Sequence, residues 1–329
     1  MGDQARIKSF REGDAFVGHL LAQEAAFKTS ARGTDYLELT LSDSSGRIKA
    51  FLWDLRAIEG ETELIQPDAF LKVKGAVVVF NSRLQLKLDK VRHAADDEIS
   101  DLSCFFPTSG RDMAEMIAEF ENYLESIRDP WLKKIAVALL RDDKGKREAF
   151  LRAPAAKNLH HVFIGGLLEH TLSVASMAEK ACGHYRELNR DLVIVATLLH
   201  DLGKIAELSY DRSFGYTDEG NLLGHITLEA LWVQNAIAEI DSFPGEIRNQ
   251  LLHILLSHHG KMEFGSPVLP KTPEAILVHY LDDLDGKLDS VFANIKEDSS
   301  AGNWTQYNKS LERMLYKTRW PSATGLAVD

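Results

Sequence analysis

The first part of the chain, up to about Arg92, alternates hydrophobic and polar residues with the period of two that is typical of half-buried strands. Turn residues interrupt the alternation, most clearly at 43–46, where Asp, Ser and Gly favour a hairpin turn. The pattern predicts five strands, over 16–23, 36–41, 47–53, 69–80 and 83–91, with a loop or short helix over 55–65. Five short strands so arranged favour a small closed barrel of Greek-key, OB-type topology.

Alternation also assigns faces within this barrel. The alternating apolar residues of the third and last strands are expected inside: Ile48, Ala50, Leu52, Leu84, Leu86 and Leu88. The outward positions include a basic and aromatic set: Lys49, Phe51, Trp53 and Lys87. Because rings stack on bases and cations meet phosphates, this set predicts a surface for single-stranded nucleic acid. The alternative is that Phe51 and Trp53 pack against the neighbouring domain while the lysines are solvated charges.

Beyond Asp96 the apolar residues recur with the helical period. Thr272-Pro273 is a helix start signal, with Thr as the cap and Pro at the first helical position. The helices expected before it cover 111–127, 131–140, 144–151, 158–185, 191–201, 222–240 and 245–258. The predicted class is therefore multidomain, a small all-β barrel followed by a mainly α-helical domain. Its parts are a barrel over 1–95, a helical connector over 96–155, a larger helical domain over 156–320 and a tail over 321–329.

Composition narrows the class of protein. With 329 residues, 45% hydrophobic and 26% charged, the chain is expected to be globular, with two or three domains. Residues 1–10 lack the apolar core of a signal peptide and no apolar run approaches the ~20 residues of a membrane span, so we expect a cytoplasmic protein without membrane contact. Cys104 and Cys182 stand alone, which argues against a disulfide or a thiolate metal site. The net charge of −11 is carried by the part after residue 95, so nucleic acid must be held by local patches or bound metal.

Ten of the twelve histidines lie between His160 and His279, interspersed with carboxylates. Imidazole nitrogens and carboxylate oxygens are the donors that divalent cations use in proteins. The strongest element is the pair His200-Asp201, which ends an apolar run. A lone buried histidine is more often a hydrogen-bonded core residue, but burying so many unpaired polar groups would cost roughly 1–3 kcal/mol each. The whole set therefore predicts a metal site.

Four segments carry a specific resemblance. They are HVFIGGLLEH at 161–170, LHDLGK at 199–204, GNLLGH at 220–225, and SHHGK at 257–261 followed by GSPVLP at 265–270. In this order they resemble the HD-domain phosphohydrolases, and with the preceding barrel the whole arrangement resembles the YhaM-type 3′ to 5′ exoribonucleases. The resemblance covers almost the full chain, from the barrel to Asp282.

The resemblance implies two divalent metal ions. One would be held by His170, His200, Asp201 and Asp282, and Asp201 would bridge to the other. Metals about 3.5 to 4 Å apart can activate a water and stabilise the departing alkoxide. Manganese is the first expectation, and iron, cobalt and zinc are alternatives that suit the same ligands.

The resemblance also implies ligands for the second ion and a catalytic lysine. His225 and His258 would hold that ion, with His259 as an additional or alternative ligand. Lys204 matches a lysine beside the reacting phosphate, so Asp201 and Lys204 are the expected catalytic pair. The alternative for Lys204 is a solvated lysine beyond the end of a helix.

Three neighbours are candidates for a supporting role. His279 lies three residues before Asp282 and can share its helix face, where it would support a ligand. Asp285 would orient a ligand, or else be a surface charge. His161, with His160, would bind phosphate if the helix begins after it, and would otherwise face away.

The combined interpretation is a metal-dependent phosphodiesterase that removes nucleotides from the 3′ end of single-stranded RNA, with single-stranded DNA as a second substrate. One rival is an HD-domain nucleotidase or cyclic-nucleotide phosphodiesterase. Relatives that open cyclic dinucleotides have a glutamate after the paired histidines and a Gly-Tyr-Pro nearby, whereas this chain has Gly260 and Gly265-Ser266-Pro267. The other rival is a nucleic-acid-binding factor with an inactive metal centre. A homo-oligomer is compatible with the acidic surface.

Overall fold

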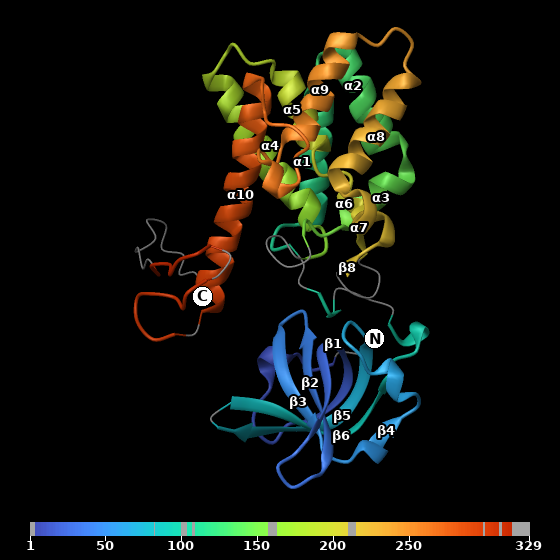
Figure 1. Ribbon diagram of the computed structural model, residues 1–329, viewed down its shortest axis with the longest axis vertical. Coiled ribbons are helices and arrows are strands. Elements are labelled where there is room, and N and C mark those ends of the chain that lie inside the picture. The colour runs from blue at the N-terminus through green and yellow to red at the C-terminus, as the bar shows by residue number, and fades with distance from the viewer. Residues whose placement is uncertain are drawn as a thin grey trace.

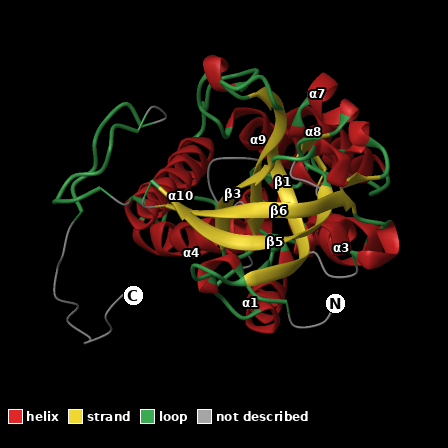
Figure 2. Cartoon of the chain, turned by 90° about the horizontal axis from the view of Figure 1, so that it is seen from below, coloured by secondary structure: helices red, strands yellow, loops and turns green. Residues whose placement is uncertain are grey.

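A computed structural model describes residues 4–81, 83–99, 104–106, 109–156, 163–209, 215–298, 300–308 and 311–317. A β-barrel at the N-terminal end is followed by a bundle of helices (Figure 1). Seen from below, the strands of the barrel lie in front of the helices (Figure 2). The predicted class, a small all-β barrel before a mainly α-helical region, is confirmed.

Five long strands close the barrel: β1 (Ala15–Thr29), β2 (Asp35–Asp43), β3 (Gly46–Leu52), β5 (Phe70–Phe80) and β6 (Arg83–His93). Antiparallel neighbours follow the order β3-β2-β1-β5-β6, and a parallel pairing of β3 with β6 completes the closure. The segment expected to be a loop or short helix contains two short 3₁₀ helices, Leu55–Ala57 and Thr62–Leu64, which confirms that expectation. Between them a two-residue strand, β4 (Ile58–Glu59), pairs with β6. β1 runs six residues beyond its predicted end, because a bulge between Ala22 and Glu24 lets it leave β5 and continue along β2.

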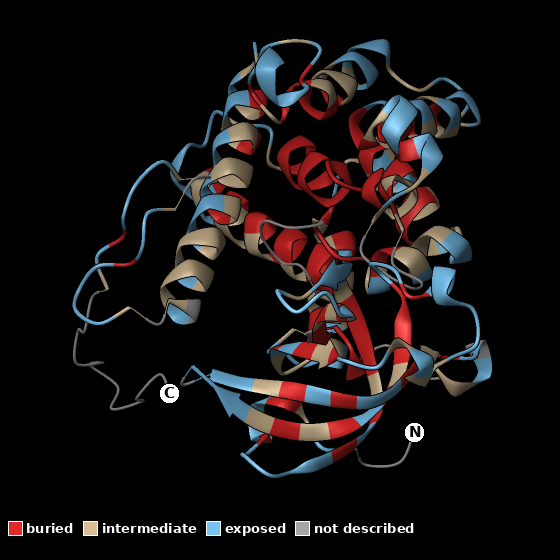
Figure 3. Cartoon of the chain, turned by 60° about the horizontal axis from the view of Figure 1, so that its bottom comes forward, coloured by how far each residue is buried: buried red, intermediate tan, exposed pale blue. Residues whose placement is uncertain are grey.

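The alternation assigned the barrel interior correctly except at Leu84. The other five residues expected inside are buried: Ile48, Ala50, Leu52, Leu86 and Leu88. Leu84 is 41% exposed, and so is its cross-strand partner Val79, at 44%. Both lie near the end of the β5–β6 hairpin, which extends past the barrel core. Figure 3 shows how buried and exposed positions alternate along these strands. Periodicity predicts the face of a side chain but not how far a hairpin continues beyond the core it covers.

Ten α-helices are described. They are α1 (Met113–Ser126), α2 (Pro130–Val137), α3 (Lys144–Arg152), α4 (Gly166–His184), α5 (Arg190–Leu199), α6 (Lys204–Glu207), α7 (Asp218–Leu223), α8 (His225–Ala238), α9 (Gly245–Ser257) and α10 (Pro273–Glu297). A five-residue π-helix, Ala138–Asp142, continues α2, and a small hairpin of β7 (Leu208–Ser209) and β8 (Gly215–Tyr216) follows α6.

Helix starts follow the capping rules, and the main departures occur at glycines. Thr272 accepts a hydrogen bond from the N–H of Ala275, so the predicted start of α10 is confirmed. The single helix expected over 222–240 is interrupted at Gly224, whose φ of 72° ends α7 and makes His225 the first residue of α8. α4 begins at Gly166, later than expected. His160 and His161 lie outside the described residues, as does the tail over 321–329.

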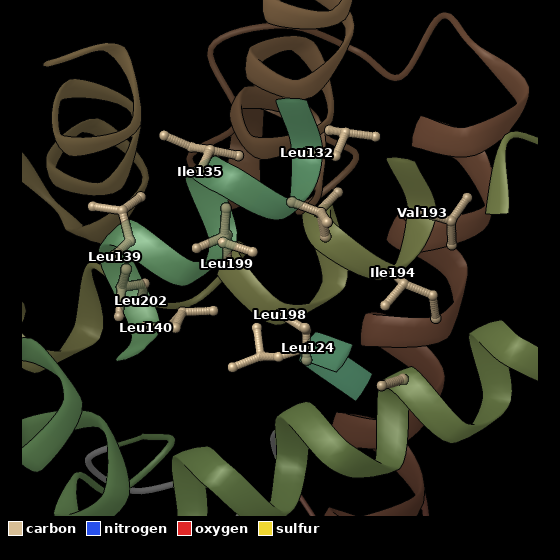
Figure 4. Packing of buried hydrophobic residues seen from close by; sticks show 14 of the residues in the cluster. Leu124, Leu132, Ile135, Leu139, Leu140, Val193, Ile194, Leu198, Leu199 and Leu202 are labelled. Atoms are coloured by element: carbon tan, nitrogen blue, oxygen red, sulfur yellow. The ribbon is translucent and has the colours of Figure 1, made fainter. Parts of the chain in front are cut away.

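α5 is the central helix of the bundle. Every residue from Asp191 to Leu199 is buried, and their side chains pack against α2, α4, α9 and α10. Figure 4 shows Leu198 and Leu199 of α5 among leucines and isoleucines of α1 and α2. The helices of the predicted connector therefore share one core with the helices that follow them. This packing fixes the C-terminal end of α5, where the pair His200-Asp201 is located.

A smaller apolar cluster joins the barrel to the segment that leads into the helices. Its buried members are Leu21, Phe70, Ala94, Cys104, Phe105 and Phe106, and Ile164 packs against them. Cys104 and Cys182 are both buried and carry no disulfide, as expected of packing residues. Among the described helices, none has the length and apolar character to cross a membrane.

Candidate metal centre

The donors predicted from sequence converge around Asp201. α4 supplies His170, His200 directly follows α5, and α10 supplies Asp282. Together with Asp201 they form one group whose nitrogen and oxygen atoms lie within 4.8 Å of one another. A second group with the same spread comprises Asp201, His225, His258 and His259. His225 is the first residue of α8, and His258 and His259 follow the end of α9. Asp201 therefore belongs to both groups, as a bridging ligand must.

In the first group, the Nε2 atoms of both histidines face the carboxylates. Nε2 of His170 lies 3.2 Å from Oδ1 of Asp282 and 3.4 Å from Oδ2 of Asp201. Nε2 of His200 lies 3.2 Å from Nε2 of His170. Burial alone would lower the pKa of His170, but the neighbouring carboxylates, with Asp201 first, raise it well above its ordinary value. Two carboxylates and two imidazole nitrogens so close together form a negatively charged set of ligands that suits a divalent cation.

The Nδ1 atoms of His170 and His200 have hydrogen-bond partners on the side of each ring away from the site. Nδ1 of His170 lies 2.7 Å from Oδ2 of Asp285, whose second oxygen accepts a hydrogen bond from Ser173. Nδ1 of His200 donates to the carbonyl oxygen of Thr197 at 2.7 Å. These contacts fix both ring orientations and direct Nε2 into the site, where it can act as a metal ligand. The position of Asp285 matches its expected role of orienting a ligand.

In the second group, three buried atoms have no hydrogen-bond partner among the described residues. They are Oδ1 of Asp201, Nε2 of His225 and Nε2 of His258. Nε2 of His225 is 3.6 Å and Nε2 of His258 is 3.8 Å from that oxygen. Each orphaned polar atom costs about 1–3 kcal/mol when buried. A divalent cation among them would satisfy all three, so these residues fit a metal ion.

These histidines also have fixed Nδ1 atoms. Nδ1 of His225 is 3.0 Å from both carboxylate oxygens of Glu207, which also accepts from the backbone N–H of His225. Nδ1 of His258 donates to the carbonyl oxygen of Leu255 at 2.7 Å. Nδ1 of His259 donates to the carbonyl oxygen of Phe264 at 2.8 Å. In each of the five histidines of the two groups, a partner holds Nδ1. Nε2 therefore points away from that partner.

Lys204 and Asp201 form the charged centre of the site. Nζ of Lys204 is 2.7 Å from Oδ2 of Asp201, and both side chains are buried. Burial disfavours the charge on Asp201, yet Lys204 and the histidines bring its pKa well below the ordinary value. Burial likewise opposes the charge on Lys204, but Asp201 and Asp282 raise its pKa above the ordinary value. Both groups are therefore charged at neutral pH, and the lysine contacts the central carboxylate directly.

Two glycines of the motifs allow close approach of the backbone. A Cβ on Gly203 would lie 2.1 Å from the carbonyl oxygen of His225. A Cβ on Gly260, which has a φ of 73°, would lie 2.1 Å from the ring of His279. Nδ1 of His279 donates to the carbonyl oxygen of His258 at 2.8 Å, so His279 lies where a supporting role would place it. The glycines bring α6 against α8 and the end of α9 against α10.

Sequence reasoning missed two acidic residues beside the second group. Glu207 is the partner of His225, and Glu229 is fully buried one turn further along α8. Oε1 of Glu229 lies 3.8 Å from Nδ1 of His258. Burial, then the charge of Asp201, raises the pKa of Glu229 well above its ordinary value. Its spacing of four from His225 was the signal available in the sequence.

On the barrel, three aromatic rings gather on the outer face. Trp53 stacks on Tyr36 at 4.6 Å between centroids, and on Phe51 at 6.2 Å. Trp53 stays half exposed, so packing against the helices does not account for this set. Lys87 faces Phe51 across the parallel β3–β6 pair. Nζ of Lys49 instead lies 3.0 Å from a carboxylate oxygen of Glu24 and 3.2 Å from one of Glu38, which neutralise it.

Comparison with known proteins places this arrangement in a class. The HD domain family model matches residues 167–287, a range that holds every donor of both groups. Fold and site thus define an HD-domain protein with an N-terminal barrel. The 3′-5′ exoribonuclease YhaM of Bacillus subtilis (strain 168) is 35% identical over 93% of this chain and 95% of its own length. The chain therefore belongs to the YhaM family, as the motifs indicated.

Likeness to solved structures is weaker. The second OB-fold domain of replication protein A from Methanococcus maripaludis is 21% identical, with 26% of this chain and 90% of that chain covered, at a TM-score of 0.21. The p204 HINb domain is 12% identical, with 28% and 47% covered, at a TM-score of 0.23. At these TM-scores neither likeness bears on the fold or the function.

Proposed function

We propose that this protein is a metal-dependent hydrolase that removes nucleotides one by one from the 3′ end of single-stranded RNA. The observation that carries the proposal is the set of three orphaned, buried donor atoms, Asp201 Oδ1, His225 Nε2 and His258 Nε2, beside a complete HD donor group. Membership of the YhaM family supports RNA as the substrate and the 3′ end as the point of attack.

Two divalent ions would be held by the two donor groups. His170, His200, Asp201 and Asp282 would bind one, and Asp201, His225, His258 and His259 would bind the other. When bound, such a pair supplies Lewis acidity and lowers the pKa of a water nucleophile. We propose manganese, with iron, cobalt or zinc as alternatives that the same donors accept.

The protein's own residues set the charge and geometry of the reaction. Asp201 turns Oδ2 toward His170 and His200, at 3.4 and 3.5 Å, and Oδ1 toward the second group. Lys204, held on Oδ2 at 2.7 Å, offsets part of the carboxylate charge, so that an anionic phosphodiester is less strongly repelled. Lys204 therefore acts on the reacting phosphate through the charge of the site and fixes the central ligand at the same time.

The barrel would retain the strand between cleavage steps. Tyr36, Phe51 and Trp53 form a stacking surface that every base can use, and Lys87 lies beside it as a cation for the backbone. Lys49 contributes less than the sequence suggested, because Glu24 and Glu38 already pair with it. Stacking does not depend on the 2′-hydroxyl, so single-stranded DNA is a second substrate in this proposal.

A labelled oligonucleotide tests the proposal. With 5′-labelled single-stranded RNA and added Mn²⁺, we expect a ladder of labelled fragments that shorten from the 3′ end and release nucleoside monophosphates. Asp201→Asn should lose activity by more than the roughly 10- to 100-fold that outer partners of metal ligands produce. Asp283→Asn is the matched control, because Asp283 is next to Asp282 on α10 but pairs with Lys287.

Three results would contradict the proposal. One is an unchanged ladder from Asp201→Asn protein that is folded like the wild type. Another is internal cleavage of the RNA in place of shortening from the 3′ end. Turnover of cyclic dinucleotides with no action on the RNA would likewise contradict it, and would favour the rival phosphodiesterase.

A further inference from the structure

The outward face of α10 is apolar along most of its length. Large hydrophobic side chains recur there every four residues, and each is 43% to 64% exposed: Ile276, Tyr280, Leu284, Leu288 and Phe292. The opposite face of the same helix supplies Asp282 to the metal centre and packs Ala275 and Val278 into the core. A surface helix usually carries polar residues on the side opposite its buried stripe. The second apolar face of α10 is therefore unusual for a protein that stays monomeric.

The C-terminal part of α10 extends past the bundle (Figure 1). Among the described side chains from Gly286 to Lys296 none is buried, although Leu288, Val291, Phe292 and Ile295 are all apolar. The exposed stripe from Ile276 to Phe292 is about 24 Å long at the rise of an α-helix. Contiguous apolar patches of this size mark interaction sites on soluble proteins.

A C-terminal arm, described over residues 300–308 and 311–317, follows this helix. Bridges from Trp304 to Tyr316 and from Asn308 to Arg313 fold it back on itself. It is tied to the end of α10 through Asp298, which pairs with Lys317 at 2.5 Å and accepts the N–H of Gln306 at 2.8 Å. In Figures 2 and 3 the arm projects away from both the barrel and the bundle.

The arm has little core of its own. Thr305 and Leu315 are buried, whereas four of its largest side chains, Trp304, Tyr307, Met314 and Tyr316, are 49% to 61% exposed among the residues that the structure describes. An arm that leaves its large aromatic side chains exposed to water needs another surface to cover them.

We propose that the outward face of α10 and the C-terminal arm together form the interface of a two-fold symmetric homodimer. The nine half-exposed side chains offer on the order of 900 Å² per chain, given about 150–250 Å² for a large aromatic residue. A stable specific interface needs about 800 Å² per partner. The helix face and the arm together reach this area, and neither reaches it alone.

Charge favours a second copy as the occupant. The chain carries a net charge of −11, which would make two copies repel each other at most surfaces. On the proposed face, however, Asp283 and Lys287 pair with each other at 2.6 Å and leave no net charge between the apolar residues. With a two-fold axis, the arm and helix of each copy contact the same elements of its partner. The apolar surface is then covered on both copies, and none is left to bind a third copy.

The experiment measures mass in solution with sedimentation velocity and light scattering at micromolar concentrations. We expect the full-length protein at about twice the chain mass of 36.8 kDa. The double variant Leu288→Lys/Phe292→Lys should have half that mass, with an unchanged far-UV spectrum, because both residues lie beyond the bundle core. Trp304→Lys, in the arm, tests the second component and should raise the dissociation constant at least tenfold.

Phe80→Lys is the matched control. Phe80 lies on the β5–β6 hairpin and is 60% exposed, close to the 64% of Phe292, so its replacement adds the same charge at a site outside the interface. It should leave the mass at the dimer value. A monomeric wild type, a trimer or larger assembly, or a dimer that survives Leu288→Lys/Phe292→Lys would each overturn the proposal.

Discussion

The substitution Gly203→Ala tests whether the second donor group depends on close backbone packing. The new Cβ would lie 2.1 Å from the carbonyl oxygen and 2.8 Å from the Cα of His225, and these neighbours are backbone atoms of α8, not a flexible side chain. Relief of this overlap requires the start of α8 to move by about 1 Å, since a Cβ essentially never lies under 3.0 Å from another heavy atom. His225 would then leave its place opposite Asp201 Oδ1.

The expected magnitude follows from that displacement. A misplacement of about 1 Å in a catalytic constellation costs about 100-fold in rate, and overpacking costs about 1–3 kcal/mol of stability. We therefore expect kcat/KM on single-stranded RNA to fall about 100-fold, with the metal content falling toward one ion per chain. Activity on labelled RNA, metal analysis after dialysis and urea unfolding measure the three effects.

Gly183→Ala is the control for adding a methyl group to a helix. Gly183 lies in α4 with no atom within 4 Å of the added Cβ, so the change should stabilise the fold by up to about 1 kcal/mol and leave activity unchanged. The reasoning would be refuted if Gly203→Ala kept two ions per chain and activity within a few-fold of the wild type.

Three other substitutions address separate parts of the molecule. Glu207→Ala removes the group that holds Nδ1 of His225, and should weaken binding of the second ion about 10- to 100-fold in a metal titration, while Glu219→Ala, exposed on α7, should not. Trp53→Ala should raise KM for long single-stranded RNA by the loss of about 1–3 kcal/mol of stacking, with kcat on a dinucleotide unchanged; equal losses on both substrates would argue against a role in strand binding. Asp191 accepts the N–H groups of Arg128 and Asp129 at 2.7 Å, and although burial opposes its charge, these bonds and Arg190 lower its pKa. A depressed folded-state pKa gives stability that is present above the unfolded value near 4 and is lost as the pH falls through the folded value. Asp191→Ala should therefore cost about 2 to 3 kcal/mol at pH 7 and flatten the loss of stability below pH 4 in urea titrations; an unchanged acid profile would contradict this.

The sequence predicted the order of elements and the donors better than it predicted their supports. Strand alternation and helix periodicity are local, so the five long strands and the capped start of α10 at Thr272 could be recognised without tertiary information. The bulge that extends β1 and the exposed end of the hairpin at Leu84 depend on the surfaces against which the strands pack, and no local pattern encodes this.

The same distinction holds at the site. His170, His200, Asp201 and Asp282 could be selected because their residue types and motifs suit a metal. Glu207 and Glu229 were not selected, because a glutamate in a helical sequence is ordinarily a surface residue, and the spacing of four between His225 and Glu229 does not by itself indicate burial beside an imidazole. Tyr36 was missed for a similar reason, since its stacking on Trp53 arises from pairing of β2 with β3.

Two of the histidines also terminate helices. His200 and His258 come directly after α5 and α9, and each ring donates through Nδ1 to the carbonyl three residues earlier, closing the last turn. The same hydrogen bond orders the helix end and selects the ring tautomer. Fraying of the last turn would therefore also turn the Nε2 atom of that histidine away from the metal site. Ion binding and helix stability must then rise and fall together, so chelation should loosen amide protection at the ends of α5 and α9 before it affects the barrel.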